Sequence, residues 1–312
     1  MGQVKEIRSG NMSLDEAMAV VQAEGYTLDK DNPELAEDFG HIDIFESQKI
    51  TATQTANGRW YHLEGDENRD NWRPSMTTCL KSLSLGPGYD DWLLTQHDYK
   101  KRDAKGIKGT HAHHWDEQLV YGNVVTIDDI YNKVINEKNH AWRELYSRPE
   151  HLATDIAKHM ESFMAFWKDK NPKPLACEYA VYDKDLPFAG RLDLIVRMKK
   201  TKASKKESIV MIDIKTGLKY PSHALQNTGY KMAWDKEHPE HIIDEIACLY
   251  TKDSYRKEPT YNLSYSKYSP EAMLRAVGCW YDQNLNKDGK VIPAVKKQPR
   301  RVFNLYNQKE GA

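Results

Sequence analysis

Cysteines are few in this sequence and widely separated. The 312 residues contain four, Cys79, Cys177, Cys248 and Cys279. No two of them have the spacing of a metal-binding pair, which argues against a zinc motif built from cysteines. Cys177 and Cys248 stand in apolar runs, as small buried residues do. This pattern is typical of proteins in a reducing cytoplasm, and we expect that location.

Long apolar segments and a large net charge are also missing. No stretch approaches the roughly 20 apolar residues that a membrane-spanning helix needs, and the N-terminal residues lack an apolar signal segment. We therefore expect a soluble intracellular protein without a membrane partner. The 45 basic residues nearly balance the 46 acidic ones, so the chain as a whole lacks the basic character of many nucleic-acid-binding proteins. Positive charge for nucleic acid would have to come from local clusters or a metal ion.

The length allows one large domain with a modest extension. Residues 1–58 are predicted to be an N-terminal accessory region, in which a helix begins at Ser13, stops near Gly25 and is followed by strands within residues 41–55. Residues 59–312 are predicted to be the main domain, with a core at residues 105–285.

Apolar periodicity predicts the elements of the main domain. Helices are expected at residues 79–85, 89–101, 128–145, 155–170, 221–234 and 270–284, and strands at 59–63, 175–182, 190–198, 208–215, 242–252 and 260–266. Residues 208–215 are so apolar that we place this strand at the sheet centre, buried on both faces. The order predicts an α/β fold with a central mixed β-sheet flanked by helices, and a small N-terminal α+β extension.

Two aspartates interrupt apolar strands, Asp193 in residues 190–198 and Asp213 in residues 208–215. Burying an aspartate in such a strand is costly unless it is paired or bound to a metal ion. Lys215 is two positions beyond Asp213, so both side chains point to the same face of the strand. Carboxylates that converge from adjacent strands suit a hard divalent ion such as Mg²⁺, which can activate water for phosphodiester hydrolysis.

Each part of this pattern also has a purely structural explanation. Asp-x-Lys triplets are common in a highly charged chain, Asp213 could simply end a strand, and Asp193 could form a salt bridge with Lys215. The whole arrangement is more specific than its parts: a strand with an aspartate, a basic loop, a strand with Asp-x-Lys, and then a helix. It favours a metal-dependent site.

Three motifs of this arrangement resemble the signature of the RecB-like branch of the PD-(D/E)XK nuclease superfamily. They are Gly190-x-x-Asp193, Asp213-x-Lys215-Thr216-Gly217 and Gln226-x-x-x-Tyr230. The resemblance covers residues 59–285 and implies a restriction-endonuclease-like core. It also implies a deoxyribonuclease that uses one or two Mg²⁺ or Mn²⁺ ions, an exonuclease rather than an endonuclease. Gln226 and Tyr230 share one helix face and, in this family, help to hold the active site or the DNA.

An upstream element extends the resemblance. Gly109-Thr110-His111-Ala112-His113 is similar to the family's Gly-Thr-x-x-His element, which implies that His113 is a metal ligand. His111, His114 and, more weakly, His159 compete for that role. The other implied ligands are Asp193, Asp213 and the carbonyl of Ile214, while Lys215 would position or deprotonate the attacking water. Glu178 is an additional candidate ligand, with a salt bridge at the sheet edge as the alternative.

The chain departs from the family pattern in two places. Leu192 replaces the proline of the superfamily name, and the iron–sulfur cysteines of some relatives are not matched, so no cluster is expected. Lys199, Lys200 and Lys202, between the catalytic strands, are candidates for DNA contact, with a solvated hairpin tip as the alternative.

The resemblance implies a role in phage or bacterial DNA recombination, repair or degradation, in the cytoplasm of a bacterium or a bacterial host. DNA would be the substrate and a phage or host recombination protein a partner, with the oligomeric state left open. Two other functions compete: a catalytically inactive DNA-binding recombination scaffold on the same fold, and a structure-specific endonuclease.

Overall fold

The structure is a computed structural model that describes residues 44–82, 99–201, 203–254 and 257–294. The chain divides into two units, Met1–Ile42 and Asp43–Ala312, and all described residues belong to the second. The helix predicted from Ser13 lies outside the described residues, as does most of the helix predicted at residues 89–101. The division after Ile42 lies earlier in the chain than the predicted boundary at residue 58, because a β-hairpin spans that position.

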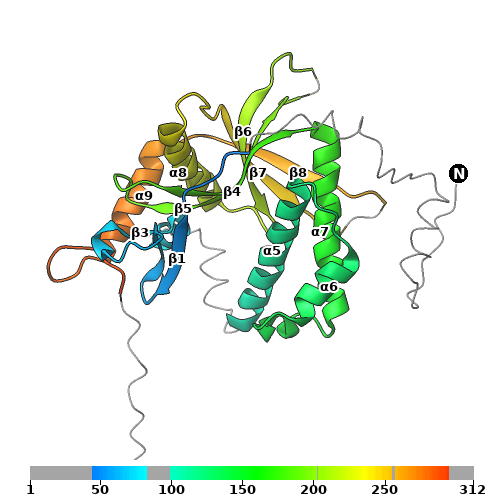
Figure 1. The fold of residues 1–312 in the computed structure, drawn as a ribbon, viewed down its shortest axis with the longest axis horizontal. Coiled ribbons are helices and arrows are strands. Elements are labelled where there is room, and N and C mark those ends of the chain that lie inside the picture. Colours follow the sequence, from blue (N-terminus) through cyan, green and yellow to red (C-terminus); the bar gives the residue numbers. More distant parts are fainter. Residues whose placement is uncertain (1–43, 83–98, 202, 255–256, 295–312) are drawn as a thin grey trace, which may run out of the picture. The chain divides into compact units, whose positions relative to one another are not determined.

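A five-stranded sheet forms the centre of the described unit (Figure 1). Its order is β4-β5-β6-β7-β8, and neighbouring strands are antiparallel except for the parallel pair β6 and β7. A parallel pair needs a long crossover connection, and the helix α8 supplies it. The predicted mixed sheet is therefore confirmed. The strands are β4 (Lys173–Tyr182), β5 (Ala189–Met198), β6 (Ser208–Lys215), β7 (Glu245–Thr251) and β8 (Tyr261–Ser266).

Helices cover both faces of this sheet (Figure 1). On one face, α8 (Pro221–Glu237) and α9 (Pro270–Gln283) pack through Trp234 and Trp280 into a core that includes Met211 of β6. On the other face, α7 (Pro149–Lys170) packs through Phe163 and Phe166 onto Val210, Ile212 and Ile214 of the same strand. The alternation along β6 shows that the strand is buried on both faces, which its apolar sequence predicted. None of the described helices is long and apolar enough to cross a bilayer.

The helix predicted at residues 128–145 is interrupted, and this prediction was wrong in its length. The structure has α6 (Ile127–Ile135) followed by a short 3₁₀ helix, η3 (His140–Glu144). Two asparagines explain the break: Asn136 is the C-cap of α6, and the side chain of Asn139 caps η3 by accepting a hydrogen bond from Ala141 N. Val134 and Trp142 still share one buried cluster, so the apolar spacing was informative although the helix is not continuous.

Other boundaries differ by less. The helix α7 begins at Pro149 rather than at residue 155, with proline at its first turn. The short helix predicted at residues 79–85 begins earlier, as α3 (Met76–Cys79) and η2 (Leu80–Ser82), because Ser75 caps it by accepting a hydrogen bond from Thr78 N. The long helix α5 (Tyr99–Val120) contacts α7 and β4 and contains the predicted histidine element.

A smaller sheet belongs to the same unit. It consists of β1 (Ile50–Thr55), β2 (Gly58–Leu63) and β3 (Arg73–Pro74), all antiparallel. Gly58 has a φ of 131°, and a Cβ there would lie 2.2 Å from Thr78 Cγ2, so this turn requires glycine. Trp60 of β2 contacts Trp280 of α9 edge to face, which fixes the small sheet to the core of the large one.

The core beneath β5 should be sensitive to cavity formation. Leu194 is 0% exposed, and Leu194→Ala should lower the free energy of unfolding by about 2–5 kcal/mol. Met164→Ala is the matched control: this side chain is 54% exposed, so its loss should change stability by less than about 0.5 kcal/mol. Urea unfolding followed by circular dichroism measures both. Equal losses in the two variants would contradict the assigned core.

Candidate metal and catalytic site

An acidic cluster forms where α5 meets β4 and β5. His113 of α5, Glu178 of β4 and Asp193 of β5 each offer one ligand atom, and these atoms all lie within 4.8 Å of one another. The Nδ1 atom of His113 is 3.6 Å from Asp193 Oδ2 and 3.8 Å from Glu178 Oε1. Three converging donors of this kind can hold a divalent cation.

The other candidate histidines have different partners. His111 is buried and lies 3.3 Å from the carboxylate of Glu137. His114 lies 3.9 Å from Glu117. His159 is buried on α7, where its Nδ1 is 3.0 Å from Thr251 Oγ1 and its Nε2 is 3.5 Å from Asp253. Of the four histidines considered from the sequence, His113 is therefore the one in the acidic cluster.

The Asp-x-Lys segment of β6 lies directly beside this cluster. The Nζ of Lys215 donates a hydrogen bond of 2.7 Å to Asp213 Oδ1, so both side chains share one face of the strand. The backbone N–H of Ile214, between them, donates a 2.7 Å hydrogen bond to Asp193 Oδ2. The structure thus brings Asp193, Asp213 and Lys215 together, and Lys215 pairs with Asp213 rather than with Asp193. A ligand role for the Ile214 carbonyl stays a prediction.

Burial and charge set the protonation of this segment. Burial raises the pKa of Asp213 above its ordinary value, although the charge of Lys215 opposes this. Burial would lower the pKa of Lys215, but the charges of Asp213 and Asp193 outweigh it and raise that pKa. Lys215 therefore stays an ammonium at neutral pH. It can orient water and stabilise negative charge, whereas an ammonium cannot accept a proton.

Side chains of the helix α8 hold Asp213 in position. Gln226 and Tyr230 are both buried, and the Nε2 of Gln226 lies 3.5 Å from Asp213 Oδ1 and 3.4 Å from the hydroxyl of Tyr230. A Cβ at Gly190 of β5 would lie 2.5 Å from the ring and the hydroxyl of Tyr230. The glycine of Gly190-x-x-Asp193 thus leaves room for the tyrosine of Gln226-x-x-x-Tyr230. The two motifs fit together as one packing unit.

The conformation of Glu178 is unusual for a strand residue. Its φ is 48°, in the left-handed region that non-glycine residues seldom adopt, at a cost on the order of 1–3 kcal/mol. Its carboxylate lies near His113 and also 3.8 Å from Arg191 Nη1. Both interpretations made from the sequence, a metal ligand and a salt bridge in the sheet, therefore have a geometric basis. Strained residues of this kind concentrate at functional sites.

Sequence reasoning missed Asp116. This residue is 1% exposed, and neither of its carboxylate oxygens has a hydrogen-bond partner among the described residues. Burial raises its pKa well above the ordinary value, and the nearby charges of Asp193 and Glu178 raise it further against the opposing effect of His113. Asp116 follows His113 by three positions, so the two share a helix face, and this spacing was the signal available in the sequence.

The unpartnered carboxylate of Asp116 bears on whether the cluster suits a cation. A buried carboxylate without a partner is expensive, and either protonation or a nearby cation removes the cost. Glu178 and Asp193 lie beside His113, and the charges of all three residues interact with Asp116. The carboxylate oxygens suit Mg²⁺ or Mn²⁺, and the imidazole is the softer ligand of the set, which Mn²⁺ accepts more readily than Mg²⁺. The residues present therefore fit a hard divalent ion.

In the basic loop after β5, Lys200 contacts other residues of the protein. The Nζ of Lys200 is 2.6 Å from Glu245 and lies 4.7 Å from the ring centre of Tyr265. These contacts favour the structural interpretation for Lys200. Lys202 lies outside the described residues. No contact of Lys199 bears on DNA binding, which stays a prediction for this loop.

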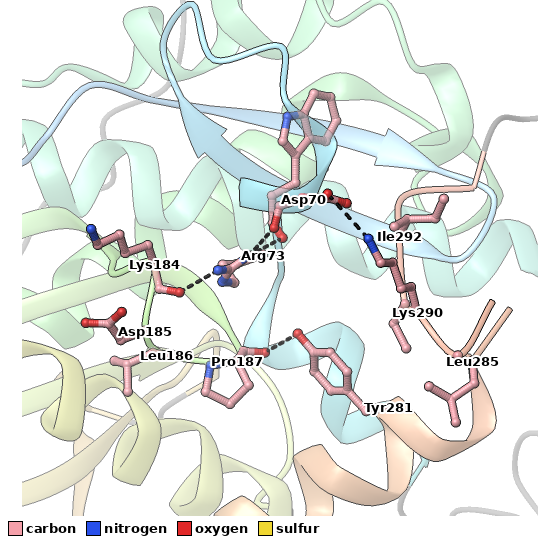
Figure 2. Close-up of a pocket in the computed structure, with 13 residues that line it drawn as sticks. Asp70, Arg73, Lys184, Asp185, Leu186, Pro187, Tyr281, Leu285, Lys290 and Ile292 are labelled. Carbon is pink, nitrogen blue, oxygen red and sulfur yellow. Dashed lines mark hydrogen bonds and ion pairs between the residues drawn. The ribbon is translucent and has the colours of Figure 1, made fainter.

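A cavity of about 530 Å³ lies elsewhere, between β3, the loop from β4 to β5 and the end of α9 (Figure 2). Its polar groups bind one another. Arg73 donates to the carbonyls of Asp70 and Trp72, Lys290 pairs with Asp70 at 3.7 Å, and Tyr281 donates to the Pro187 carbonyl. None of the residues of the acidic cluster lines it, so it is not part of the candidate site.

Comparisons with known proteins give little beyond this geometry. No protein family matches the chain, and no curated protein matches it. Among solved structures, the chain is similar to one described as "Crystal structure of SSO0001", with 11% identity and a TM-score of 0.23, over 55% of this chain and 84% of that chain. A similarity this low does not define a family, so the function has to be inferred from the site.

The packing of Gly190 against Tyr230 should be measurable. In Gly190→Ala the new methyl group meets the rigid ring of Tyr230, so the free energy of unfolding should fall by about 1–3 kcal/mol. The double variant Gly190→Ala/Tyr230→Ala should lose less than the sum of the two single losses, because the smaller side chain removes the clash. Additive losses in this double-mutant cycle would show that the two residues do not interact.

The protonated form of His113 should stabilise the metal-free protein. Burial would lower its pKa, but Asp193 and Glu178 outweigh this effect and raise the pKa from 6.5 to about 9. A raised pKa contributes stability that is fully present below pH 6.5 and is lost as the pH rises through about 9. With a chelator present, the stability difference between the wild type and His113→Gln should therefore shrink from pH 6.5 to 9. A difference that stays constant or grows would contradict this assignment.

Proposed function

We propose that the protein is a divalent-metal-dependent deoxyribonuclease of the RecB-like PD-(D/E)XK type, with a restriction-endonuclease-like core. The observation that carries the proposal is the hydrogen bond from Ile214 N to Asp193 Oδ2, since it joins Asp193 to the strand segment that presents Asp213 and Lys215. Two acidic groups and one ammonium thus meet at the junction of β5 and β6. The carboxylates can hold a divalent ion and the ammonium can stabilise negative charge, two functions that support metal-dependent phosphodiester hydrolysis.

His113, Glu178 and Asp193 would hold Mg²⁺ or Mn²⁺, with Asp213 and the Ile214 carbonyl as neighbouring ligands. When bound, such an ion neutralises charge on the scissile phosphate and lowers the pKa of water. Asp213 does not belong to the three-residue cluster, but its charge interacts with that of Asp193. This arrangement supports either one ion bound by the cluster or two adjacent ions.

The protein's own groups position and stabilise the reacting atoms. Asp213 orients the ammonium of Lys215 through their 2.7 Å hydrogen bond. Because its pKa is raised, Lys215 keeps its charge, orients the attacking water and stabilises the negative charge that develops on the phosphate oxygens. Gln226 keeps Asp213 in place from α8. The deprotonation of water by Lys215, the other role considered, is disfavoured by the same charge.

The motifs favour an exonuclease that acts in phage or bacterial DNA recombination, repair or degradation, in the cytoplasm, with a recombination protein as a partner. A catalytically inactive DNA-binding scaffold would have no need for a partly buried ammonium beside two carboxylates. Maintaining that arrangement is costly without a reaction to serve, because buried charges pay a desolvation penalty.

Removing the ammonium should slow the reaction. Lys215→Ala should lower the rate of Mg²⁺-dependent cleavage of linear duplex DNA by about 10²–10³-fold, the usual contribution of one group that stabilises developing negative charge. Asp213→Ala should lose more, since it also removes a ligand. Lys236→Ala is the matched control. Lys236 lies at the C-terminal end of α8, is half exposed and pairs with Asp183, so its loss should leave the rate unchanged. Circular dichroism checks that each variant folds.

The substrates in this assay also decide the mode of cleavage. An exonuclease degrades linear DNA and spares covalently closed circles and end-blocked duplexes. Cleavage of circles would replace the exonuclease proposal by an endonuclease. If the wild type binds DNA but degrades none of these substrates with Mg²⁺ or Mn²⁺, the protein is an inactive scaffold and the nuclease proposal is wrong.

A further inference from the structure

A second set of side chains that can act as metal ligands includes Asp213 and lies on the side of the carboxylate away from Lys215. Asp213, His223 and Cys248 each offer one ligand atom, and these atoms all lie within 4.8 Å of one another. Asp213 and Cys248 are direct register partners on the parallel strands β6 and β7, and His223 stands in the first turn of α8. The crossover β6-α8-β7 thus assembles an oxygen, a nitrogen and a sulfur donor at one point.

The two oxygens of Asp213 have different partners. Oδ1 accepts the hydrogen bonds from Lys215 and Gln226. Oδ2 lies 3.7 Å from Cys248 Sγ. Asp213 therefore stands between the proposed catalytic lysine and the Cys248 thiol, and its Oδ2 is the oxygen that contacts this thiol.

Neighbouring groups hold the other two donors in place. His223 Nδ1 lies 3.2 Å from the hydroxyl of Tyr250, which leaves Nε2 for another partner. Histidines that bind metals usually have their second ring nitrogen fixed in this way. The buried amide of Asn227 donates to Cys248 Sγ at 3.4 Å, and a donor to sulfur stabilises a thiolate.

We propose that Asp213, His223 and Cys248 form a site for a borderline-soft divalent transition-metal ion of the Zn²⁺ type. One sulfur, one imidazole and one carboxylate are the ligands that Zn²⁺ prefers, and three protein ligands leave a fourth position for water. Mg²⁺ takes oxygen ligands and is poorly served by a thiolate. The thiol of Cys248 therefore favours a Zn²⁺-type ion over Mg²⁺ at this second set of residues. On binding, Cys248 releases its thiol proton to solvent.

Occupation of this site would inhibit the nuclease, a consequence that rests on the proposed function. An ion bound to Oδ2 withdraws negative charge from Asp213 and weakens its hold on Lys215 and on the neighbouring hard ion. Zn²⁺ would then compete with Mg²⁺-dependent cleavage through one shared carboxylate.

Cobalt(II) is a spectroscopic probe for this site. Titration of the chelator-treated full chain with Co²⁺ should produce a sulfur-to-cobalt charge-transfer band in the near ultraviolet that saturates at one ion per chain, and Zn²⁺ should abolish it. The band should disappear in Cys248→Ala and fall sharply in His223→Gln. Cys279→Ser is the matched control, because Cys279 is exposed and should leave the band unchanged.

The result that overturns the site is a wild type without the band, or a band that survives Cys248→Ala or is lost in Cys279→Ser. If Cys248→Ala fails to fold, His223→Gln decides: an unchanged Co²⁺ affinity refutes the site, and an affinity lower by about 10–100-fold or more supports it.

The inhibition is tested separately. Zn²⁺ should inhibit Mg²⁺-dependent cleavage by the wild type, and the concentration for half inhibition should rise by about 10–100-fold in His223→Gln. Equal inhibition of both proteins refutes the inhibitory role. If the wild type shows the cobalt band but degrades no DNA, the metal site stands and the proposed nuclease function fails.

Discussion

The site depends on one constraint: acidic side chains crowd together in the protein with too few positive partners. Glu178, Asp193 and Asp116 surround His113, and Asp116 has no hydrogen-bond partner among the described residues. Burying like charges at such short range is unfavourable unless a cation or protons compensate them. Lys215 compensates Asp213 at hydrogen-bond distance, while protonated His113 and Arg191 compensate part of the charge of Asp193 and Glu178. The remaining negative charge is the physical reason to infer a divalent ion.

The fold produces this crowding through strand pairing and close packing. The antiparallel pair β5 and β6 sets Asp193 beside Ile214, so that a backbone N–H fixes the carboxylate. The parallel crossover to β7 places α8 over the same strand end, where Gln226 and Tyr230 reach Asp213 and the space above Gly190. Each motif residue is therefore either a chemical group of the site or a packing element that holds one. With no matching family, this chemistry carries the functional inference.

Much of the central sheet could be predicted from sequence, because apolar runs and the two-residue period of strands are local signals. Residues 208–215 match β6, and the same period places Asp213 and Lys215 on one face. The interrupted helix at residues 128–145 was missed because two asparagine caps, Asn136 and Asn139, outweigh continuous apolar spacing. The neighbourhood of Asp213 and Cys248 was also missed, since the pairing of β6 with β7 spans a whole helix and leaves no local signal. For Asp116, the only signal in the sequence was its three-residue spacing from His113.

Anomalous diffraction from crystals grown with Mn²⁺ tests the central claim most directly, because it locates the ion without reference to activity. The account predicts a manganese peak within about 2.0–2.3 Å of oxygens of Glu178 and Asp193 and of a ring nitrogen of His113. In that structure, Asp116 should also gain a partner, either the ion or one of its waters. A fully ordered site with no manganese, or manganese bound only at unrelated surface carboxylates, would contradict the claim that this acidic cluster exists to hold a divalent cation.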